Sequence, residues 1–350
     1  MRRLAFALAV LGLVGAALPA TAQERTTFRI AWSIYVGWMP WGYAADAGIV
    51  QRWADKYGIE IEVVQINDYI ESINQYTAGA FDGCVMTNMD ALTIPAVGGV
   101  DSTALIIGDF SNGNDGIVSK TATTVADLAG ERVNLVELSV SHYLLARALE
   151  MNDLRERDLT VVNTSDADLV AAFTSSADVR HVVTWNPLLA EVAAYPGATK
   201  LFDSSQIPGE IIDMMVVNTD VLAANPNFGK ALVGAWYETM AIMSGDDAAA
   251  IAARTAMAEA SGTDLEGYDM QLASTEMFFD PADAVAFTNS PDLVTTMENV
   301  RLFSDEHGLL EGGLDFVGIA FPDGTVLGNP ANIKLRFTNE FMAMAATGEL

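Results

Sequence analysis

The sequence predicts an α/β protein of two lobes, and three observations support this. Short apolar runs alternate with helical patterns along most of the chain, the rhythm typical of sheets covered by helices. Removing a predicted leader of 22 residues from 350 leaves about 328, too many for one compact core. A Gly-, Asn- and Asp-rich break near residue 113 separates two such series. We therefore expect one lobe to be inserted into the other.

Residues 1–22 have the pattern of a secretory signal peptide. Arg2 and Arg3 give a basic start, an apolar run covers 4–18, and small residues lead to Ala22, after which cleavage is expected. The apolar run is shorter than the roughly 20 residues needed to span a bilayer. We therefore expect an exported protein without direct insertion into the membrane.

The first series after the leader alternates strand and helix. Apolar runs predict strands at 28–32, 60–65, 83–86 and 102–108. Helical spacing predicts helices at 40–57 with an interruption near Gly48, at 69–78 and at 91–97. The segment 109–116 is rich in Gly, Asn and Asp, which favours a turn-rich connection that crosses between the lobes.

The second series repeats this rhythm and ends in helices. Strands are predicted at 133–136, 159–162, 182–183 and 214–217, the last clear strand. Helices are predicted at 140–151, 167–173, from Pro187 onward and throughout 226–307. The predicted division is 26–112 for the first part of lobe 1, 113–215 for the inserted lobe 2, and 216–350 for the return of lobe 1 with C-terminal helices.

Charge and cysteine content exclude several classes of function. The chain has 18 Lys and Arg against 46 Asp and Glu, a formal net charge of −28, and losing Arg2 and Arg3 makes it −30. Such a surface repels nucleic acid and anionic lipid. Cys84 is the single cysteine, so no intrachain disulfide can form, and its apolar neighbours predict a small buried side chain.

Motifs of the common enzyme classes are missing from the sequence. No Gly-x-Ser-x-Gly nucleophile motif and no phosphate-binding loop occur. The three histidines, His142, His181 and His307, are scattered, and one cysteine adds little to a zinc site. We therefore expect no catalytic residues, no metal site and no cofactor.

Polar and aromatic residues collect in the segments that follow the predicted strands, where open α/β sheets bind ligands. They are Ser33, Tyr35, Trp38, Trp41, Thr87, Asn88, Asp90, Asp109, Ser111, Asp115, Glu137, Ser139, Ser141, His142, Trp185, Asn186, Glu210 and Asp213. Lys and Arg are absent from these segments. This absence indicates a ligand that is not held by cationic side chains.

Five of these segments together resemble the periplasmic solute-binding proteins of the nitrate, sulfonate and taurine type, which include thiamine-precursor relatives. The resemblance rests on Trp32–Trp38, Thr87–Leu92, Asp115–Val118, Ser139–Leu145 and Trp185-Asn186-Pro187. It implies the two-lobed periplasmic-binding-protein-like fold of type II, with two hinge crossings and a helical C-terminal region. It also implies a monomer in the periplasm that captures a small-molecule solute for the membrane permease of an ABC importer.

One segment departs from the anion-binding members of that family. They resemble one another in a Gly-Ser pair that opens a second-lobe helix and binds the anion through backbone N–H groups. This chain has Glu137-Leu138-Ser139 there, and the segment resembles the subgroup associated with urea carboxylase genes. A carboxylate at this place favours a cation or a hydrogen-bond donor, so we expect guanidinium or urea.

The expected binding site combines carboxylates, aromatic faces and polar groups for such a ligand. Its residues are Glu137, Asp90, Asp109, Trp38, Tyr35, Trp185, Asn88, Ser139, Ser33 and Asn186.

Structural roles stay open for several of these residues, and other functions stay open for the chain. Glu137 would also suit a helix N-terminus, Asp90 a helix cap, Asp109 a turn, and Trp38 or Trp185 the core. The alternative functions are binding of a sulfonate, taurine, nitrate or pyrimidine, docking to a sensor, and an enzyme that resembles thiamine-precursor synthases.

Overall fold

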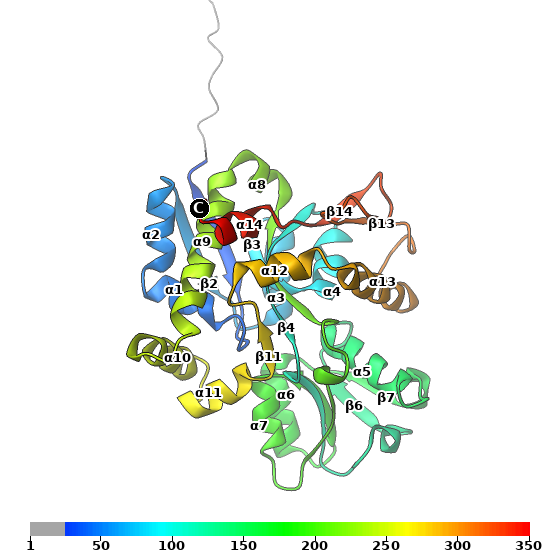
Figure 1. Cartoon of the computed structure of the whole chain (residues 1–350). Helices are drawn as coiled ribbons and strands as arrows, with labels where there is room; N and C mark the ends of the chain where they lie inside the picture. The colour runs from blue at the N-terminus through cyan, green and yellow to red at the C-terminus, as the bar shows by residue number, and fades with distance from the viewer. Residues whose placement is uncertain (1–24) are drawn as a thin grey trace, which may run out of the picture.

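The computed structural model describes residues 25–350 and contains two separate β-sheets with helices packed around them. The predicted signal peptide lies outside the described residues. In Figure 1 the part with the nine-stranded sheet lies above the part with the five-stranded sheet, and we call them the larger and the smaller lobe. This arrangement confirms the predicted α/β fold class.

The larger sheet combines strands from both ends of the chain. Its order is β13-β12-β14-β4-β10-β3-β1-β2, and β11 pairs with β4. Strand β10 is antiparallel to both of its neighbours, β3 and β4. The strands are β1 (Thr27–Trp32), β2 (Glu60–Gln65), β3 (Gly83–Thr87), β4 (Ser102–Ser111), β10 (Ile212–Asn218), β11 (Thr275–Met277), β12 (Gly318–Ala320), β13 (Val326–Gly328) and β14 (Ile333–Phe337).

The smaller sheet has the order β7-β6-β8-β5-β9 and is formed by one continuous segment of the chain. Its strands are β5 (Asp115–Ser119), β6 (Arg132–Leu135), β7 (Thr160–Asn163), β8 (His181–Trp185) and β9 (Thr199–Asp203). Its helices are η2 (Val125–Leu128), α5 (Val140–Glu150), η3 (Glu156–Asp158), α6 (Asp166–Ser175), α7 (Leu188–Ala193) and η4 (Ser204–Gln206).

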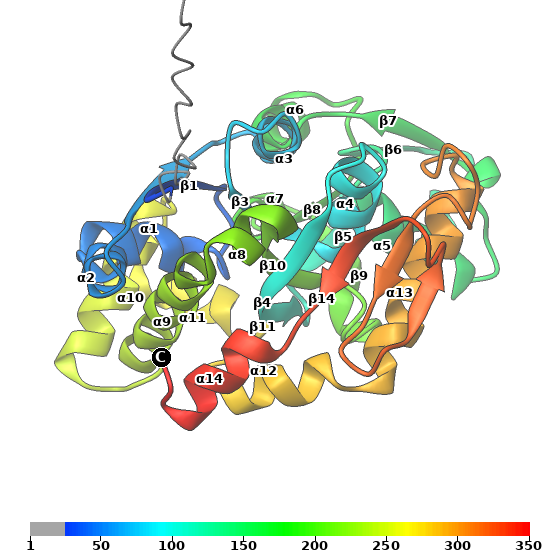
Figure 2. The same ribbon diagram turned by 90° about the horizontal axis from the view of Figure 1, so that it is seen from above.

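The remaining helices belong to the larger lobe. They are α1 (Met39–Asp46), α2 (Ile49–Lys56), α3 (Tyr69–Thr77), α4 (Asn88–Ala91), η1 (Leu92–Ala96), α8 (Thr219–Ala224), α9 (Pro226–Met243), α10 (Ala248–Ala260), α11 (Leu265–Leu272), α12 (Pro281–Thr288), α13 (Pro291–Glu306) and α14 (Glu340–Thr347). Seen from above, β4, β10 and β14 run side by side and α14 packs near α9 (Figure 2). Among these described helices, none has the length and apolar character required to cross a bilayer.

The chain passes between the lobes twice, through neighbouring strands. It leaves the larger sheet at the end of β4 and returns to it at the start of β10, and the two strands pair with each other. The predicted division at 112/113 falls between β4 and β5, whereas the one at 215/216 falls inside β10. The exact lobe boundaries stay a prediction.

Three details of the sequence prediction were wrong. The segment 109–116 is not all turn, since β4 continues to Ser111 and β5 starts at Asp115. Strand β9 was missed, and β10 is not the last strand, because β11 to β14 follow it. These added strands are short or half-buried, so they lack the apolar runs by which the others were found.

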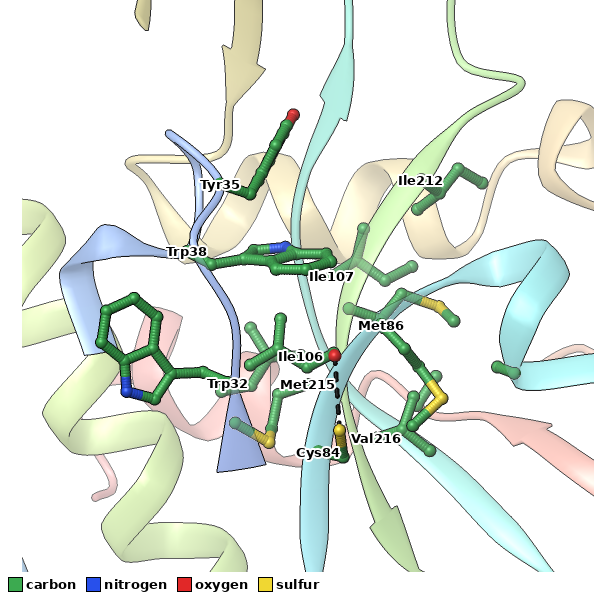
Figure 3. Packing of buried hydrophobic residues seen from close by; sticks show 14 of the residues in the cluster. Trp32, Tyr35, Trp38, Cys84, Met86, Ile106, Ile107, Ile212, Met215 and Val216 are labelled. Atoms are coloured by element: carbon green, nitrogen blue, oxygen red, sulfur yellow. Dashed lines mark hydrogen bonds between the residues drawn. The ribbon is translucent and has the colours of Figure 1, made fainter. Parts of the chain in front are cut away.

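Cys84 is fully buried in β3, as predicted. Figure 3 shows it in the apolar core of the larger sheet, near Met86, Met215 and Val216. Burial raises the pKa of its thiol to about 12, so the thiolate that reacts with oxidants and labels hardly forms.

The contact between α2 and α9 requires a glycine. An ideal Cβ built on Gly234 in α9 would lie 2.3 Å from Cε3 of Trp53 in α2. The Trp53 indole Nε1–H donates to Glu238 Oε2 at 2.6 Å, which holds the ring in this position.

We expect Gly234→Ala to lower the free energy of unfolding by about 2 kcal/mol, because the indole must move and its hydrogen bond to Glu238 breaks. Urea unfolding followed by circular dichroism measures this change. Gly245→Ala is the matched control, since the nearest atom to its ideal Cβ is 3.5 Å away, and its effect stays within about 0.5 kcal/mol. Equal stabilities of the two variants would contradict the steric argument.

Candidate functional site

A small cavity lies between the two lobes, at the ends of the strands that connect them. It is lined by Tyr35, Trp38, Tyr69, Thr87, Asp115, Val140, Trp185, Ile211 and Asp213. The larger lobe, the smaller lobe and the β10 crossing all contribute residues. The cavity volume is about 20 Å³, which is enough space for about one bound water molecule. A solute larger than water therefore requires the lobes or the lining side chains to move apart.

Strand pairing brings the acidic residues of the site together. Asp213 on β10 pairs with Asp109 on β4 and with Thr87 on β3. Asp115, the first residue of β5, pairs with Trp185, the last residue of β8. The carboxylates thus come from the ends of strands in both lobes.

Four aspartates are buried at or next to this cavity. Asp90 and Asp109 are 0 % exposed, Asp115 is 2 % exposed and Asp213 is 3 % exposed. Asp115 and Asp213 line the cavity, and no lining residue is cationic. Burying carboxylates without a cation is costly, so the group either takes up protons or binds a positive ligand.

The pKa values of all four carboxyl groups are raised, chiefly by burial. Burial and the neighbouring Asp115 raise the pKa of Asp109 to about 7. Burial and Asp90 raise the pKa of Asp115 to about 7, and burial raises that of Asp90 to about 6. Burial and the neighbouring Asp109 and Asp115 raise the pKa of Asp213 well above its usual value. The two carboxyl groups of the Asp109–Asp213 pair lie opposite each other without a cation between them, so their surroundings oppose ionisation of both at once.

Aromatic rings form the walls around these carboxyl groups. The Tyr35 and Trp38 ring centroids are 5.0 Å apart, those of Trp38 and Tyr69 are 5.4 Å apart, and those of Tyr69 and Trp185 are 5.8 Å apart. Figure 3 shows the Trp38 indole between Tyr35 and the apolar residues of the larger sheet. The faces of such rings attract cations within about 6 Å.

Hydrogen bonds hold the carboxylates but leave some atoms free. Tyr69 Oη donates to Asp90 Oδ2 at 2.6 Å, and Thr87 Oγ1 donates to the same oxygen at 2.7 Å. Tyr35 Oη donates to Asp109 Oδ1 at 3.2 Å. Among residues 25–350, Asp90 Oδ1, Asp109 Oδ2 and the Trp38 Nε1–H have no hydrogen-bond partner. Buried polar atoms without partners are uncommon and mark a place for a ligand or for bound water.

Five of the ten residues expected from the sequence lie at this site. Tyr35, Trp38 and Trp185 line the cavity. Asp109 accepts a hydrogen bond from the lining residue Tyr35, and Asp90 accepts one from the lining residue Tyr69. The structure therefore brings together the aromatic residues and the two aspartates of the predicted set.

The other five expected residues do not line the cavity. Glu137 is exposed in the turn before α5. Ser139 caps α5, accepting from Ser141 N–H at 3.2 Å. Asn88 Nδ2 donates to the Glu210 carbonyl, and its Oδ1 accepts from Ile212 N–H. Asn186 Oδ1 accepts from Ala190 N–H in α7, and Ser33 is buried but does not line the cavity. Asp115 and Asp213 are the carboxylates that line this cavity, and Glu137 does not line it.

Six lining residues were absent from the expected set, namely Tyr69, Thr87, Asp115, Val140, Ile211 and Asp213. Thr87, Asp115 and Asp213 belonged to the polar residues that follow the predicted strands, but nothing ranked them above their neighbours. The pairing of β10 between β3 and β4 makes Asp213 central, and no local pattern in the sequence shows that pairing.

Comparisons with known proteins agree with this architecture. The structure is similar to the periplasmic aliphatic sulphonate-binding protein of Escherichia coli, with a TM-score of 0.65 and 19 % identity over 81 % of this chain and 94 % of that one. It is also similar to the alkanesulfonate-binding protein of Xanthomonas axonopodis pv. citri bound to MOPS, with a TM-score of 0.62 and 20 % identity over 80 % and 96 %. For the periplasmic nitrate-binding protein of Synechocystis PCC 6803 the TM-score is 0.55, with 14 % identity over 93 % and 98 %.

These likenesses confirm the predicted periplasmic-binding-protein-like fold. No curated protein sequence matches the chain. The model of the family described as NMT1/THI5 like matches residues 53–250, which is more than half of the chain and extends from α2 in the larger lobe through the whole smaller lobe to α10. The chain belongs to the NMT1/THI5-like family.

Proposed function

We propose that the protein is the periplasmic solute receptor of an ABC importer and that its solute is a small nitrogen-rich cation, guanidinium, with urea as the closest alternative. The receptor would act as a monomer and deliver the solute to the membrane permease. The resemblance of its segments to such receptors and the fold shared with sulphonate- and nitrate-binding proteins support the general role.

One observation carries the choice of a cation. Asp109, Asp115 and Asp213 lie together, buried, and no cationic residue lines the cavity between them and the aromatic walls. Guanidinium is planar and has N–H donors around its whole edge, which carboxylates accept in pairs. Its flat faces fit against Trp38 and Trp185. A cation also removes the cost of burying ionised carboxylates.

The helix that resembles the anion site of sulfonate receptors is poorly suited to an anion here. The Ser139 hydroxyl oxygen accepts a hydrogen bond from Ser141 N–H at the start of α5. This N–H group is therefore not available to an anion. Leu138 has a φ of 62°, a conformation that glycine adopts more easily. An anion bound beside Val140 would also lie in the cavity that Asp115 and Asp213 line, where like charges repel.

Binding would couple to closure of the lobes. Tyr35, Trp38 and Tyr69 belong to the larger lobe, whereas Asp115 and Trp185 belong to the smaller one. A solute contacts both sets only when the lobes are closed, so it stabilises that state by its differential affinity. The strands at the two crossings would bend.

Calorimetric titration of the purified protein with guanidinium, urea, taurine, nitrate and an aminopyrimidine tests this proposal. We expect saturable binding of guanidinium at pH 8, weaker binding of urea because it has no charge, and no binding of taurine or nitrate. Binding of taurine or nitrate would overturn the cation assignment. Binding of the aminopyrimidine alone would assign the aromatic walls to stacking on a larger ring and would overturn it as well.

A further inference from the structure

A second cluster of titratable groups joins the two lobes away from the cavity. His142 is in α5 and Glu156 is in η3 of the smaller lobe, whereas His307 ends α13 of the larger lobe. His142 is 3 % exposed, and the side chains of His307 and Glu156 are 14 % and 29 % exposed. The cluster borders a groove of about 760 Å³ between α13 and the α5–η3 segment.

One carboxylate oxygen lies between the two imidazole rings. Glu156 Oε1 is 2.8 Å from His307 Nε2, with which it forms a hydrogen bond. The same oxygen is 2.9 Å from His142 Nε2, a close contact that lacks the alignment of a straight hydrogen bond. The rings of His142 and His307 are 5.1 Å apart, and His307 stacks on Phe303 at 3.9 Å. The three side chains therefore connect α13 to the smaller lobe directly.

The other nitrogen of each ring shows where the protons are. Leu138 N–H donates to His142 Nδ1 at 3.1 Å, so the lone pair of the neutral ring is on Nδ1. The other nitrogen, Nε2, then carries the proton and has no lone pair for a ligand. His307 Nδ1 is 2.7 Å from the Phe303 carbonyl oxygen, which only accepts, so Nδ1 carries a proton. His307 Nε2 also faces an acceptor, Glu156, so the surroundings favour a His307 ring that is protonated on both nitrogens.

This protonation pattern decides between a metal and a proton at the cluster. Ligand atoms of His142, Glu156 and His307 lie within 4.8 Å of one another, a spacing that a metal ion could bridge. A metal requires a lone pair on each coordinating nitrogen, and the proton on His142 Nε2 removes one of them. The geometry favours an ion pair of protonated His307 with Glu156.

We propose that His307 and Glu156 form a proton-dependent latch that stabilises the closed arrangement of the lobes. The latch forms when His307 is protonated and is lost when His307 becomes neutral. His142 and the stacking of His307 on Phe303 hold the two partners in place. The latch goes beyond the proposed receptor function, and it acts whichever solute the cavity binds.

The electrostatic surroundings support protonation of His307 in the closed state. Burial alone would lower the pKa of His307, but its hydrogen bonds to Glu156 and the Phe303 carbonyl, together with nearby Glu306, raise it above its usual value. Burial would raise the pKa of Glu156, but His142 and His307 lower it to about 2. The other charged residues that line the groove are Arg147, Glu150, Asp153, Arg155, Arg157 and Glu306. Closure thus takes up a proton, and the stabilisation is lost as pH rises through the raised pKa of His307.

Spin labels on the two lobes measure closure without any solute. Gln51→Cys in α2 and Glu191→Cys in α7 place labels on exposed positions of opposite lobes, and buried Cys84 stays unlabelled. Distances are measured at pH 6 and pH 8.5 for the labelled parent, Glu156→Gln and His307→Gln. Glu131→Gln is the matched control, because Glu131 pairs with Arg180 and His181 inside the smaller lobe.

We expect each latch variant to lower the closed-to-open ratio about fivefold at pH 6, the effect of an ion pair worth about 1 kcal/mol, and to match the parent at pH 8.5. The cavity carboxylates titrate in every variant, so this difference from the parent isolates the latch. The Glu131→Gln control should follow the parent at both pH values. Equal ratios in parent and latch variants at pH 6 would overturn the proposal without affecting solute binding. Stabilisation of the parent by Zn²⁺ alone, lost in both His142→Gln and His307→Gln, would also overturn it and assign a metal site.

Discussion

An Asp115→Asn variant is expected to bind guanidinium on the order of 100-fold more weakly than the parent at pH 8, a loss of about 3 kcal/mol. Asp115 lines the cavity and is the carboxylate that the smaller lobe contributes to it. Asparagine keeps the shape of the side chain but removes the charge that pairs with the cation. Calorimetric titration measures the loss, and the result tests the site directly.

Two variants make this result specific. Glu137→Gln changes the exposed carboxylate outside the cavity, so guanidinium should bind to it as tightly as to the parent. Asp213→Asn should lose less affinity than Asp115→Asn, because the pKa of Asp213 is raised well above its usual value and this carboxyl therefore carries less negative charge to lose. Weak binding by Glu137→Gln together with normal binding by Asp115→Asn would contradict the site described here and return the carboxylate role to the start of α5.

The unliganded protein is expected to be less stable at pH 8 than at pH 5.5. Burial raises the pKa of Asp90 to about 6 and, with neighbouring carboxylates, raises that of Asp109 and Asp115 to about 7. A carboxyl group whose pKa is raised by folding contributes stability below its unfolded pKa and loses it as pH rises through the folded value. The stability lost over this window is on the order of several kcal/mol. Thermal unfolding followed by circular dichroism at the two pH values measures it.

The Asp115→Asn variant separates this electrostatic effect from a general effect of pH. Asp115→Asn should unfold at a higher temperature than the parent at pH 8, because it no longer buries that charge, although it binds guanidinium poorly. Guanidinium at millimolar concentration should raise the unfolding temperature of the parent at pH 8 and leave that of Asp115→Asn nearly unchanged. A parent as stable at pH 8 as at pH 5.5 would show that the buried carboxylates are compensated in another way.

The fold could be predicted from the sequence where local patterns determine it. Strands buried on both faces, such as 83–87 and 212–218, contain continuous apolar runs, and helices such as 140–150 show apolar residues at helical spacing. Strands β9 and β11 to β14 are short or half-buried. Strands β9 and β11 pair with β5 and β4, which lie far away in the chain. Strands β12 to β14 pair largely with one another but are too short or too exposed to form an apolar run.

The kinds of residue at the site could be predicted from the sequence better than the particular residues that line the cavity. The shortage of Lys and Arg after the strands and the clustering of aromatic and acidic residues predict a site for a cation or a donor. The choice of Glu137 rested on its place before a helix, but the turn directs that residue to solvent. Tyr69 opens the helix that follows strand 60–65, a segment from which no site residue was expected, and only the tertiary structure brings it against Trp38 and Trp185.

The pairing of Asp109 with Asp213 has a mechanical consequence. The two residues sit opposite each other on β4 and β10, the strands through which the chain passes between the lobes. If both carboxylates were ionised, their repulsion would push these strands apart at the crossing where we propose that they bend. A proton or a bound cation removes that force. The angle between the lobes would therefore depend on whether a proton or a cation in the cavity neutralises this pair of carboxylates.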